Sequence, residues 1–167
     1  MRNVDKRHNM AHELQEMLHH EIPLSQQMGL TVLHYDGNYL ALRAPLAPNI
    51  NHKATAFAGS LNAVMTLAGW GTVWLVLREH DLRGTIVIQE STTRYLLPVG
   101  NDFTATCRIP AEEEQEVEQF ITWLQRWGKA RISLKVEILD GAGRVAVAFT
   151  GAYVAFAHAS ERPREGA

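Results

Sequence analysis

Apolar positions follow two spacings along this chain, one typical of helices and the other typical of strands. In segments 8–20 and 111–127, apolar residues recur three or four positions apart, which predicts two amphipathic helices. In segment 131–138, isoleucine, leucine and valine alternate strictly with polar residues, and this pattern predicts a half-buried strand. The chain therefore contains both kinds of element, and their order along the sequence decides the fold class.

The segment Leu61–Leu77 is different, because it runs for seventeen residues without a charged side chain. It predicts the centre of a long helix, over residues 58–79, that is buried on all sides. A membrane span is the alternative interpretation, but the segment is short for one and contains Asn62 and Thr66. We therefore expect a core helix and no membrane partner.

Further strands are predicted where runs rich in β-branched and aromatic residues are bounded by glycine, proline or asparagine. They cover residues 30–35, 39–44, 85–97, 102–109 and 144–156. The resulting order is helix, two strands, long helix, two strands, helix, two strands. Strands clustered around one apolar helix favour an α+β fold in which an antiparallel sheet wraps that helix. We expect residues 1–157 to form one domain and the charged residues 158–167 to form a disordered tail.

Composition narrows the possible partners. The 167 residues carry a formal net charge of −2, so no global positive field would attract nucleic acid. The single cysteine, Cys107, cannot form an intrachain disulfide and lies in a strand-like run, which predicts a small buried hydrophobe. The N-terminal segment 1–21 contains no apolar stretch of signal-peptide length, and we expect a cytoplasmic protein. His8 and His12 are one helical turn apart, but no further ligand is well placed, so we expect no metal ion and no cofactor.

Two motifs carry a resemblance to a known fold and function. The first opens the long helix and contains Asn51, His52, Lys53, Thr55, Phe57, Ala58, Gly59 and Ser60, followed by Leu67-Ala68-Gly69-Trp70-Gly71. The second ends a predicted strand with Arg94-Tyr95-Leu96-Leu97-Pro98-Val99-Gly100. Over residues 10–157 the chain resembles the hotdog-fold thioesterases, and most closely the thioesterase domain that is fused behind an acetyltransferase in some bacterial proteins.

The resemblance implies a hotdog fold, in which a curved antiparallel sheet wraps one long helix. It also implies hydrolysis of acyl-CoA or acyl-carrier-protein thioesters by a homodimer or a dimer of dimers, with an active site shared between subunits. By position, Asn51 matches the Asn or Asp that assists catalysis in the family, and Phe57-Ala58-Gly59 replaces the usual His-Gly-Gly. Thr66 stands where a water-activating carboxylate is often found, and residues 37–78 contain neither Asp nor Glu.

Elementary chemistry agrees with a thioester site at the start of the long helix. Unpaired backbone N–H groups at Gly59 and Ser60 would stabilise the oxyanion that develops on a thioester carbonyl. Asn51 could orient the carbonyl or the attacking water, although an asparagine here could equally serve only as a cap of the loop. His52 could exchange a proton near neutral pH.

The remaining roles are less determined by the sequence. The general base stays open between His52, Glu90 on the following strand, and the hydroxyl of Ser60 or Thr66 next to an amide. Lys53 and Arg94 flank the motifs and are candidates for holding the nucleotide of CoA. The residues predicted to contact the substrate are Lys53, Phe57, Ala58, Glu90 and Arg94.

Two other functions stay open. Because the long helix lacks a carboxylate, the protein could bind acyl thioesters without hydrolysing them. A dehydratase acting on 3-hydroxyacyl thioesters is the third interpretation. It is the weakest, because no histidine is paired with a carboxylate on matching elements.

Overall fold

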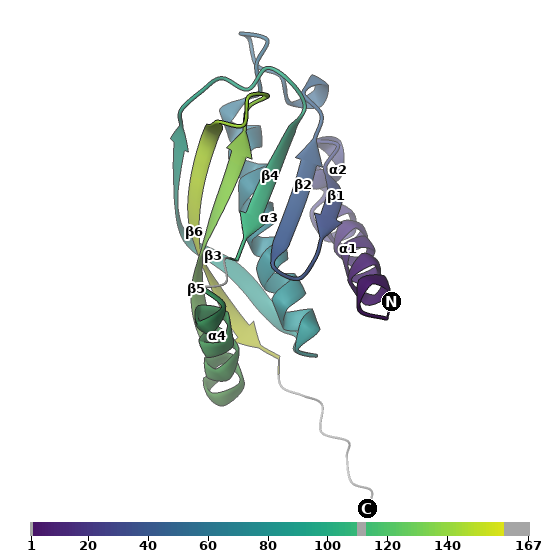
Figure 1. Ribbon diagram of the computed structural model, residues 1–167, viewed down its shortest axis with the longest axis vertical. Coiled ribbons are helices and arrows are strands. Elements are labelled where there is room, and N and C mark those ends of the chain that lie inside the picture. Colours follow the sequence, from purple (N-terminus) through teal and green to yellow (C-terminus); the bar gives the residue numbers. More distant parts are fainter. Residues whose placement is uncertain (1, 110–112, 159–167) are drawn as a thin grey trace, which may run out of the picture.

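The computed structural model describes residues 2–109 and 113–158, and this part of the chain folds into one sheet that curves around a long helix, with further helices beside it (Figure 1). The helices are α1 (Arg2–Glu21), α2 (Pro23–Gln27), α3 (Ala58–Glu79) and α4 (Glu114–Trp127), with a 3₁₀ helix at Ala47–Asn49. The strands are β1 (Thr31–Tyr35), β2 (Tyr39–Ala44), β3 (Gly84–Tyr95), β4 (Phe103–Arg108), β5 (Lys129–Leu139) and β6 (Val145–Ala157).

The predicted elements are present, with differences at their ends. The first helix begins at residue 2 and not at residue 8. The added turns are polar, and Arg7 in them pairs with Glu79 of α3 (3.1 Å). The two short helices, α2 and Ala47–Asn49, were not predicted, since neither is long enough to show a periodic pattern. Residues 111 and 112 of the predicted second amphipathic helix, and 159–167 of the predicted tail, lie outside the described residues.

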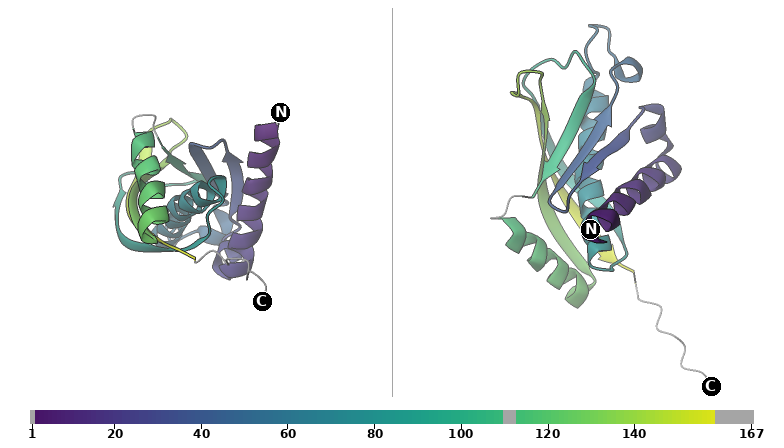
Figure 2. Two further views of the ribbon diagram at one scale, coloured as in Figure 1. Left: turned by 90° about the horizontal axis from the view of Figure 1, so that it is seen from below. Right: turned by 45° about the vertical axis from the view of Figure 1, so that its right-hand side comes forward.

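The six strands form one antiparallel sheet in the order β1-β2-β4-β5-β6-β3. Figure 2 shows α3 inside the curve of this sheet, with α1 and α4 on opposite sides of α3. β5 alternates between exposed and buried side chains along its whole length, as its sequence pattern predicts. A curved antiparallel sheet around one long helix is the hotdog fold, and the predicted α+β class is confirmed.

α3 is apolar around most of its circumference because the sheet surrounds it. It contacts five strands, β2 to β6, and eleven of its 22 residues are buried. By length and composition alone α3 would also fit a membrane span, yet 61% of its most apolar stretch is buried inside the protein. Burial by the sheet therefore accounts for its composition.

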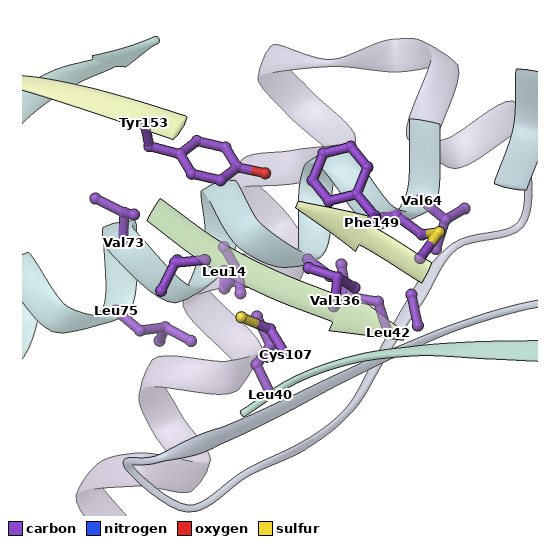
Figure 3. Packing of buried hydrophobic residues seen from close by; sticks show 14 of the residues in the cluster. Leu14, Leu40, Leu42, Val64, Val73, Leu75, Cys107, Val136, Phe149 and Tyr153 are labelled. Atoms are coloured by element: carbon purple, nitrogen blue, oxygen red, sulfur yellow. The ribbon is translucent and has the colours of Figure 1, made fainter. Parts of the chain in front are cut away.

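Close approach between α3 and its neighbours depends on two glycines. Gly69 lies against the ring of Tyr153 on β6, whose hydroxyl donates a hydrogen bond to the backbone carbonyl of Thr66 (2.9 Å). Gly71 lies against leucines of α1 and β2. Figure 3 shows Tyr153 among the buried apolar side chains, together with Cys107. Burial raises the pKa of the Cys107 thiol to about 12, so this residue is the small buried hydrophobe that was predicted.

The two edges of the sheet differ in what covers them. β1 lies beside α1, where Oε1 of Gln15 accepts a hydrogen bond from the N–H of Val32 (2.6 Å). β3 forms the opposite edge, and Ile86 is its only buried side chain, at 7% exposed. Large apolar side chains stay exposed along this edge and just beyond it, at Val87, Ile88, Tyr95 and Leu96. Within the described chain the outer backbone edge of β3 is unpaired, and soluble proteins usually cover or pair such an edge.

Candidate active site

A cavity of about 330 Å³ lies where the loop before α3 meets the end of β3. Five of its lining residues come from the loop and the first turns of α3: Asn51, Thr55, Ala56, Ala58 and Leu61. The other five end β3 and follow it: Tyr95, Leu96, Leu97, Pro98 and Val99. The two motifs that carried the resemblance therefore form the two walls of one cavity.

Polar side chains outside the cavity fix the loop that forms its first wall. Asn49 is 2% exposed, and its Nδ2 donates to two backbone carbonyl oxygens (2.9 and 2.7 Å). The carbonyl of Asn49 accepts the N–H of Phe57 (2.7 Å), which sets where α3 begins. Asp102 accepts hydrogen bonds from the N–H of Leu46 (2.9 Å) and from Arg43 (2.8 Å), and these bonds hold the pKa of Asp102 below its usual value.

Asn51 organises the tight turn between itself and Ala56. Its Nδ2 donates to Oγ1 of Thr55 (3.0 Å) and to the carbonyl of Ala56 (3.2 Å). Its Oδ1 accepts the N–H groups of Lys53 (2.8 Å) and Thr55 (3.2 Å). Between them Ala54 has a φ of 58°, a conformation that residues other than glycine rarely adopt. Both hydrogens of the Asn51 amide are used inside the loop, so its geometry is that of a residue that positions the cavity wall.

The first turn of α3 presents free backbone N–H groups. Phe57 precedes the helix, and no side chain caps it there. Within the described residues, Leu61 is the first helix residue whose N–H reaches a backbone carbonyl, that of Phe57 (3.0 Å). The N–H groups of Ala58, Gly59 and Ser60 are therefore available, and they carry the positive end of the helix dipole.

Gly59 has a structural reason to be a glycine. A Cβ atom at this position would collide with the ring of Phe57, which folds back over the first turn of α3. Phe57 is itself 55% exposed, so the ring forms an apolar wall beside the helix start without closing it. The small residue thus makes room for a neighbouring side chain, in addition to leaving its backbone accessible.

Two polar contacts hold the end of β3 against α3. The hydroxyl of Tyr95 donates to the carbonyl of Ala58 (3.1 Å), at the start of the helix. One turn further along, Nδ2 of Asn62 donates to Oγ1 of Thr93 (2.6 Å). These contacts fix the separation of the two cavity walls.

Only some of the predicted site residues come together in the structure. Asn51 and Ala58 line the cavity. His52 and Lys53 are exposed in the same loop, outside the lining. Thr66 is half-buried two turns further along α3, and it does not line the cavity either.

Glu90 and Arg94 lie on the other face of the sheet. β3 has a bulge between Ile88 and Glu90, and the extra residue reverses which side chains face α3 beyond it. Tyr95 consequently points toward α3, whereas Glu90 and Arg94 point outward. Glu90 lies 3.7 Å from the guanidinium of Arg131 on β5, and neither Glu90 nor Arg94 lines the cavity of its own chain.

The cavity is chemically neutral. None of its ten lining residues is acidic, basic or a histidine. Among residues 2–109 and 113–158, no group of three or more His, Cys, Asp or Glu side chains is arranged to hold a metal ion. The polar chemistry of the wall is therefore that of an amide, a threonine hydroxyl, a phenol and backbone groups.

Reasoning from polar residue types missed most of the lining, because only Asn51 and Ala58 of its ten residues were predicted site residues. Thr55, Tyr95 and the apolar run Leu96–Val99 line the cavity but were not named as site residues. The signal was present, since all of them belong to the two motifs. What the motifs could not indicate was which side chains turn toward the helix, because the bulge in β3 decides that.

Comparisons with known proteins agree with this fold. Residues 11–157 match the model of a family described as putative thioesterase (yiiD_Cterm). The solved structure of a putative thioesterase from Shewanella oneidensis matches with a TM-score of 0.80 and 35% identity, covering 89% of this chain and 98% of that one. A protein of unknown function from Chlorobaculum tepidum matches with a TM-score of 0.87 and 36% identity, covering 91% and 97%. A probable thioesterase from Pseudomonas aeruginosa matches with a TM-score of 0.74 and 26% identity, covering 88% of this chain and 95% of that one. The likeness to a domain fused behind an acetyltransferase stays a prediction.

Proposed function

The chain belongs to the putative thioesterase (yiiD_Cterm) family, and we propose that it hydrolyses the acyl thioester of CoA or of acyl carrier protein. The observation that carries this proposal is the uncapped start of α3 beside the cavity, where the N–H groups of Ala58, Gly59 and Ser60 have no partner within the described chain. A thioester lying along the wall Leu96–Val99 would bring its carbonyl oxygen to these groups. In known enzymes, removing one such donor costs about 3 kcal/mol of transition-state stabilisation.

The reaction follows from this placement. A water oxygen attacks the carbonyl carbon, the C–S bond breaks, and a carboxylic acid and a free thiol are released. The N–H groups stabilise the negative charge on the carbonyl oxygen, while Asn51 keeps the wall in place. The proton of the water needs an acceptor, and the lining of a single chain offers none. His52, next to Asn51 in the loop, is our candidate, because imidazole accepts a proton near neutral pH.

We also propose that the active form is a homodimer in which two copies of β3 pair in antiparallel fashion. The strand is an open edge of twelve residues with exposed apolar side chains. Glu90 and Arg94 are four residues apart on one face. In a pair centred near Thr92, Glu90 of each copy faces the partner's Arg94, which is the self-complementarity that a two-fold interface requires. Association of two such dimers stays a prediction.

Charge reversal in β3 tests this pairing. Arg94→Glu places like charges opposite each other twice in the dimer, so we expect its dissociation constant to rise by at least about tenfold. The double variant Glu90→Arg/Arg94→Glu restores opposite charges and should dimerise more tightly than either single variant. Sedimentation equilibrium measures both, with Arg126→Glu on α4 as the control. A wild-type protein that sediments as a monomer, or a double variant no tighter than the single ones, would contradict the pairing.

Hydrolysis is tested by thiol release from a panel of acyl-CoAs, followed with a thiol-reactive chromophore. We expect saturable release by the wild-type protein. Ala58→Phe adds a ring to the cavity wall and should lower kcat/KM by about tenfold or more, because it displaces the carbonyl from the helix start. The matched control is Ala142→Phe, which adds the same ring to the exposed β5–β6 turn. Equal activity of the two variants would place the reaction elsewhere.

One alternative is favoured by a specific observation. The neutral lining of the cavity suits a protein that binds acyl thioesters without hydrolysing them. Calorimetry with a non-hydrolysable acyl-CoA analogue distinguishes the two functions when it is combined with the thiol assay. Saturable binding without thiol release on any acyl-CoA would overturn hydrolysis in favour of binding, and hydration of an enoyl-CoA would select the dehydratase.

A further inference from the structure

The cavity beside Asn51, which we call the Asn51 cavity, lies at the start of α3 and the end of β3. A recess bordered by cations lies at the other ends of these two elements. A cavity of about 340 Å³ opens between the end of α3 and the start of β3, with Trp74 and His158 in its lining. It adjoins a cavity of about 390 Å³, and the two share Arg78, Leu82 and Arg83. The ionisable side chains that line the pair are Lys6, Arg78, Arg83 and His158, together with Glu13 and Asp81. We call this pair of cavities the cationic recess.

Arg83 and Lys6 are the Lys and Arg side chains of this recess that form no ion pair within the described residues, and Arg83 is the one that lines both cavities. It is exposed, and no carboxylate of the described chain lies within ion-pair distance of it. His158 is fixed beside it, since its N–H donates to the carbonyl of Arg83 (2.9 Å) and its Nε2 lies 3.0 Å from a threonine hydroxyl of β3. Arg78 is already engaged, because it pairs with Glu13 (2.7 Å) and stacks on Trp74 at 5.0 Å.

Within one chain the cationic recess is too far from the Asn51 cavity to share a ligand with it. Gly84 begins β3 at the recess and Tyr95 ends β3 at the cavity. The twelve residues of an extended strand span about 40 Å. The pantetheine arm of a thioester substrate is much shorter than this distance.

Antiparallel pairing of two β3 strands would bring the cationic recess of one chain closer to the Asn51 cavity of the other. In full overlap, Gly84 of one chain lies opposite the partner's Tyr95. In the register centred near Thr92, the two strands overlap over residues 89–95, and Arg83 lies six residues, or roughly 20 Å, beyond the partner's Tyr95. Both registers bring Arg83 closer to the cavity of the second copy than to that of its own chain, so each dimer would contain two grooves, each with backbone N–H groups at one end and a cation at the other.

We propose that Arg83, with His158 beside it, binds phosphate of a CoA thioester whose acyl carbonyl lies in the partner's Asn51 cavity. The planar guanidinium matches phosphate geometry with two parallel hydrogen bonds. The inference rests on the proposed hydrolysis and on the β3 dimer, and it adds which residues of the second subunit complete the site. Each subunit then supplies the carbonyl end of one groove and the phosphate end of the other.

Substrates with and without phosphate test the role of Arg83. The same acyl group is presented on CoA, on 4′-phosphopantetheine and on pantetheine. For Arg83→Ala, the ratio of kcat/KM on acyl-CoA to that on acyl-pantetheine should fall by about tenfold, and Arg126→Ala on α4 should leave the ratio unchanged. An equal fall in the ratio of kcat/KM on acyl-phosphopantetheine to that on acyl-pantetheine assigns the contact to the phosphate that an acyl carrier protein also bears. A fall for acyl-CoA alone assigns the contact to the nucleotide. An unchanged ratio for both Arg83→Ala and Arg83→Glu overturns the proposal.

Subunit mixing tests whether the contact is made across the dimer. A heterodimer of Asn51→Ala and Arg83→Glu chains, separated by two affinity tags, keeps one intact groove if the two residues come from different subunits. Its kcat/KM on acyl-CoA should then be about half that of the wild type. Activity at the mean of the two variant homodimers would mean that both residues act within one chain.

If no thioester is hydrolysed at all, the proposed function fails by itself. Tighter calorimetric binding of CoA than of pantetheine by the wild type, lost in Arg83→Glu, would still support the phosphate site, and the same preference for CoA in both proteins would reject it.

Discussion

Replacing Asn51 by Ala is expected to lower kcat/KM on acyl-CoA by about 100-fold, because it releases one wall of the cavity. The side-chain amide of Asn51 makes five hydrogen bonds within its own loop, to Lys53, Thr55 and Ala56. Without them the positive φ of Ala54 (58°) is no longer enforced, and the loop can relax away from the start of α3. Steady-state thiol release measures the loss.

The same substitution should also reduce the free energy of unfolding, by about 1–2 kcal/mol, since backbone groups lose their partners. This second effect separates positioning from direct catalysis. Asn51→Asp keeps the acceptor for the N–H groups of Lys53 and Thr55, so we expect it to recover part of both stability and activity. Asn38→Ala, in the turn after β1, is the matched control. A 100-fold loss with unchanged stability and no recovery by aspartate would contradict a positioning role.

Much of the fold could be predicted because burial imposes a period on the sequence. α3 lacks charge over the stretch that the sheet encloses, and β5 alternates because one of its faces packs inward. α2 and the 3₁₀ helix at Ala47–Asn49 are too short to repeat a pattern even once, and they are fixed by contacts far along the chain. Asn49, for example, donates to the carbonyl of Met28, at the end of α2, and to that of Pro45, four residues before it.

The candidate site was predictable in its location and less so in its members. The loop and strand-end motifs gave both walls, yet strand alternation counted from Ile86 and Ile88 would turn Arg94 toward α3. The bulge at Gln89 inserts one residue, so Tyr95 turns inward instead. The sequence left Asn51 open between orienting the substrate and capping the loop, and only the hydrogen-bond geometry reveals that both hydrogens of its amide are used inside the loop. Both depend on local backbone conformation, which residue types alone do not fix.

Replacing Gly69 by Ala is expected to destabilise the protein by about 2–4 kcal/mol, although alanine favours a helix by about 1 kcal/mol over glycine. The added Cβ would collide with the hydroxyl of Tyr153 and lie 2.6 Å from its Cζ. Tyr153 is fully buried and bonds to the carbonyl of Thr66 (2.9 Å), so its ring cannot move aside without losing that bond. Urea denaturation followed by circular dichroism measures the change in the free energy of unfolding.

Gly71→Ala is the matched control, because it makes the same change two residues later in the same helix. Its Cβ would lie 3.1 Å from terminal methyl groups of Leu14 and Leu40, which can shift, so we expect a change within about 1 kcal/mol. Tyr153→Phe removes the colliding oxygen, and the double variant with Gly69→Ala should be more stable than the sum of the single effects predicts. If Gly69→Ala were as stable as Gly71→Ala, the contact between Tyr153 and α3 would not be what sets the depth of the helix in the sheet. That depth matters for the site, since α3 carries the cavity wall at its start and Asn62, which bonds to β3, one turn later.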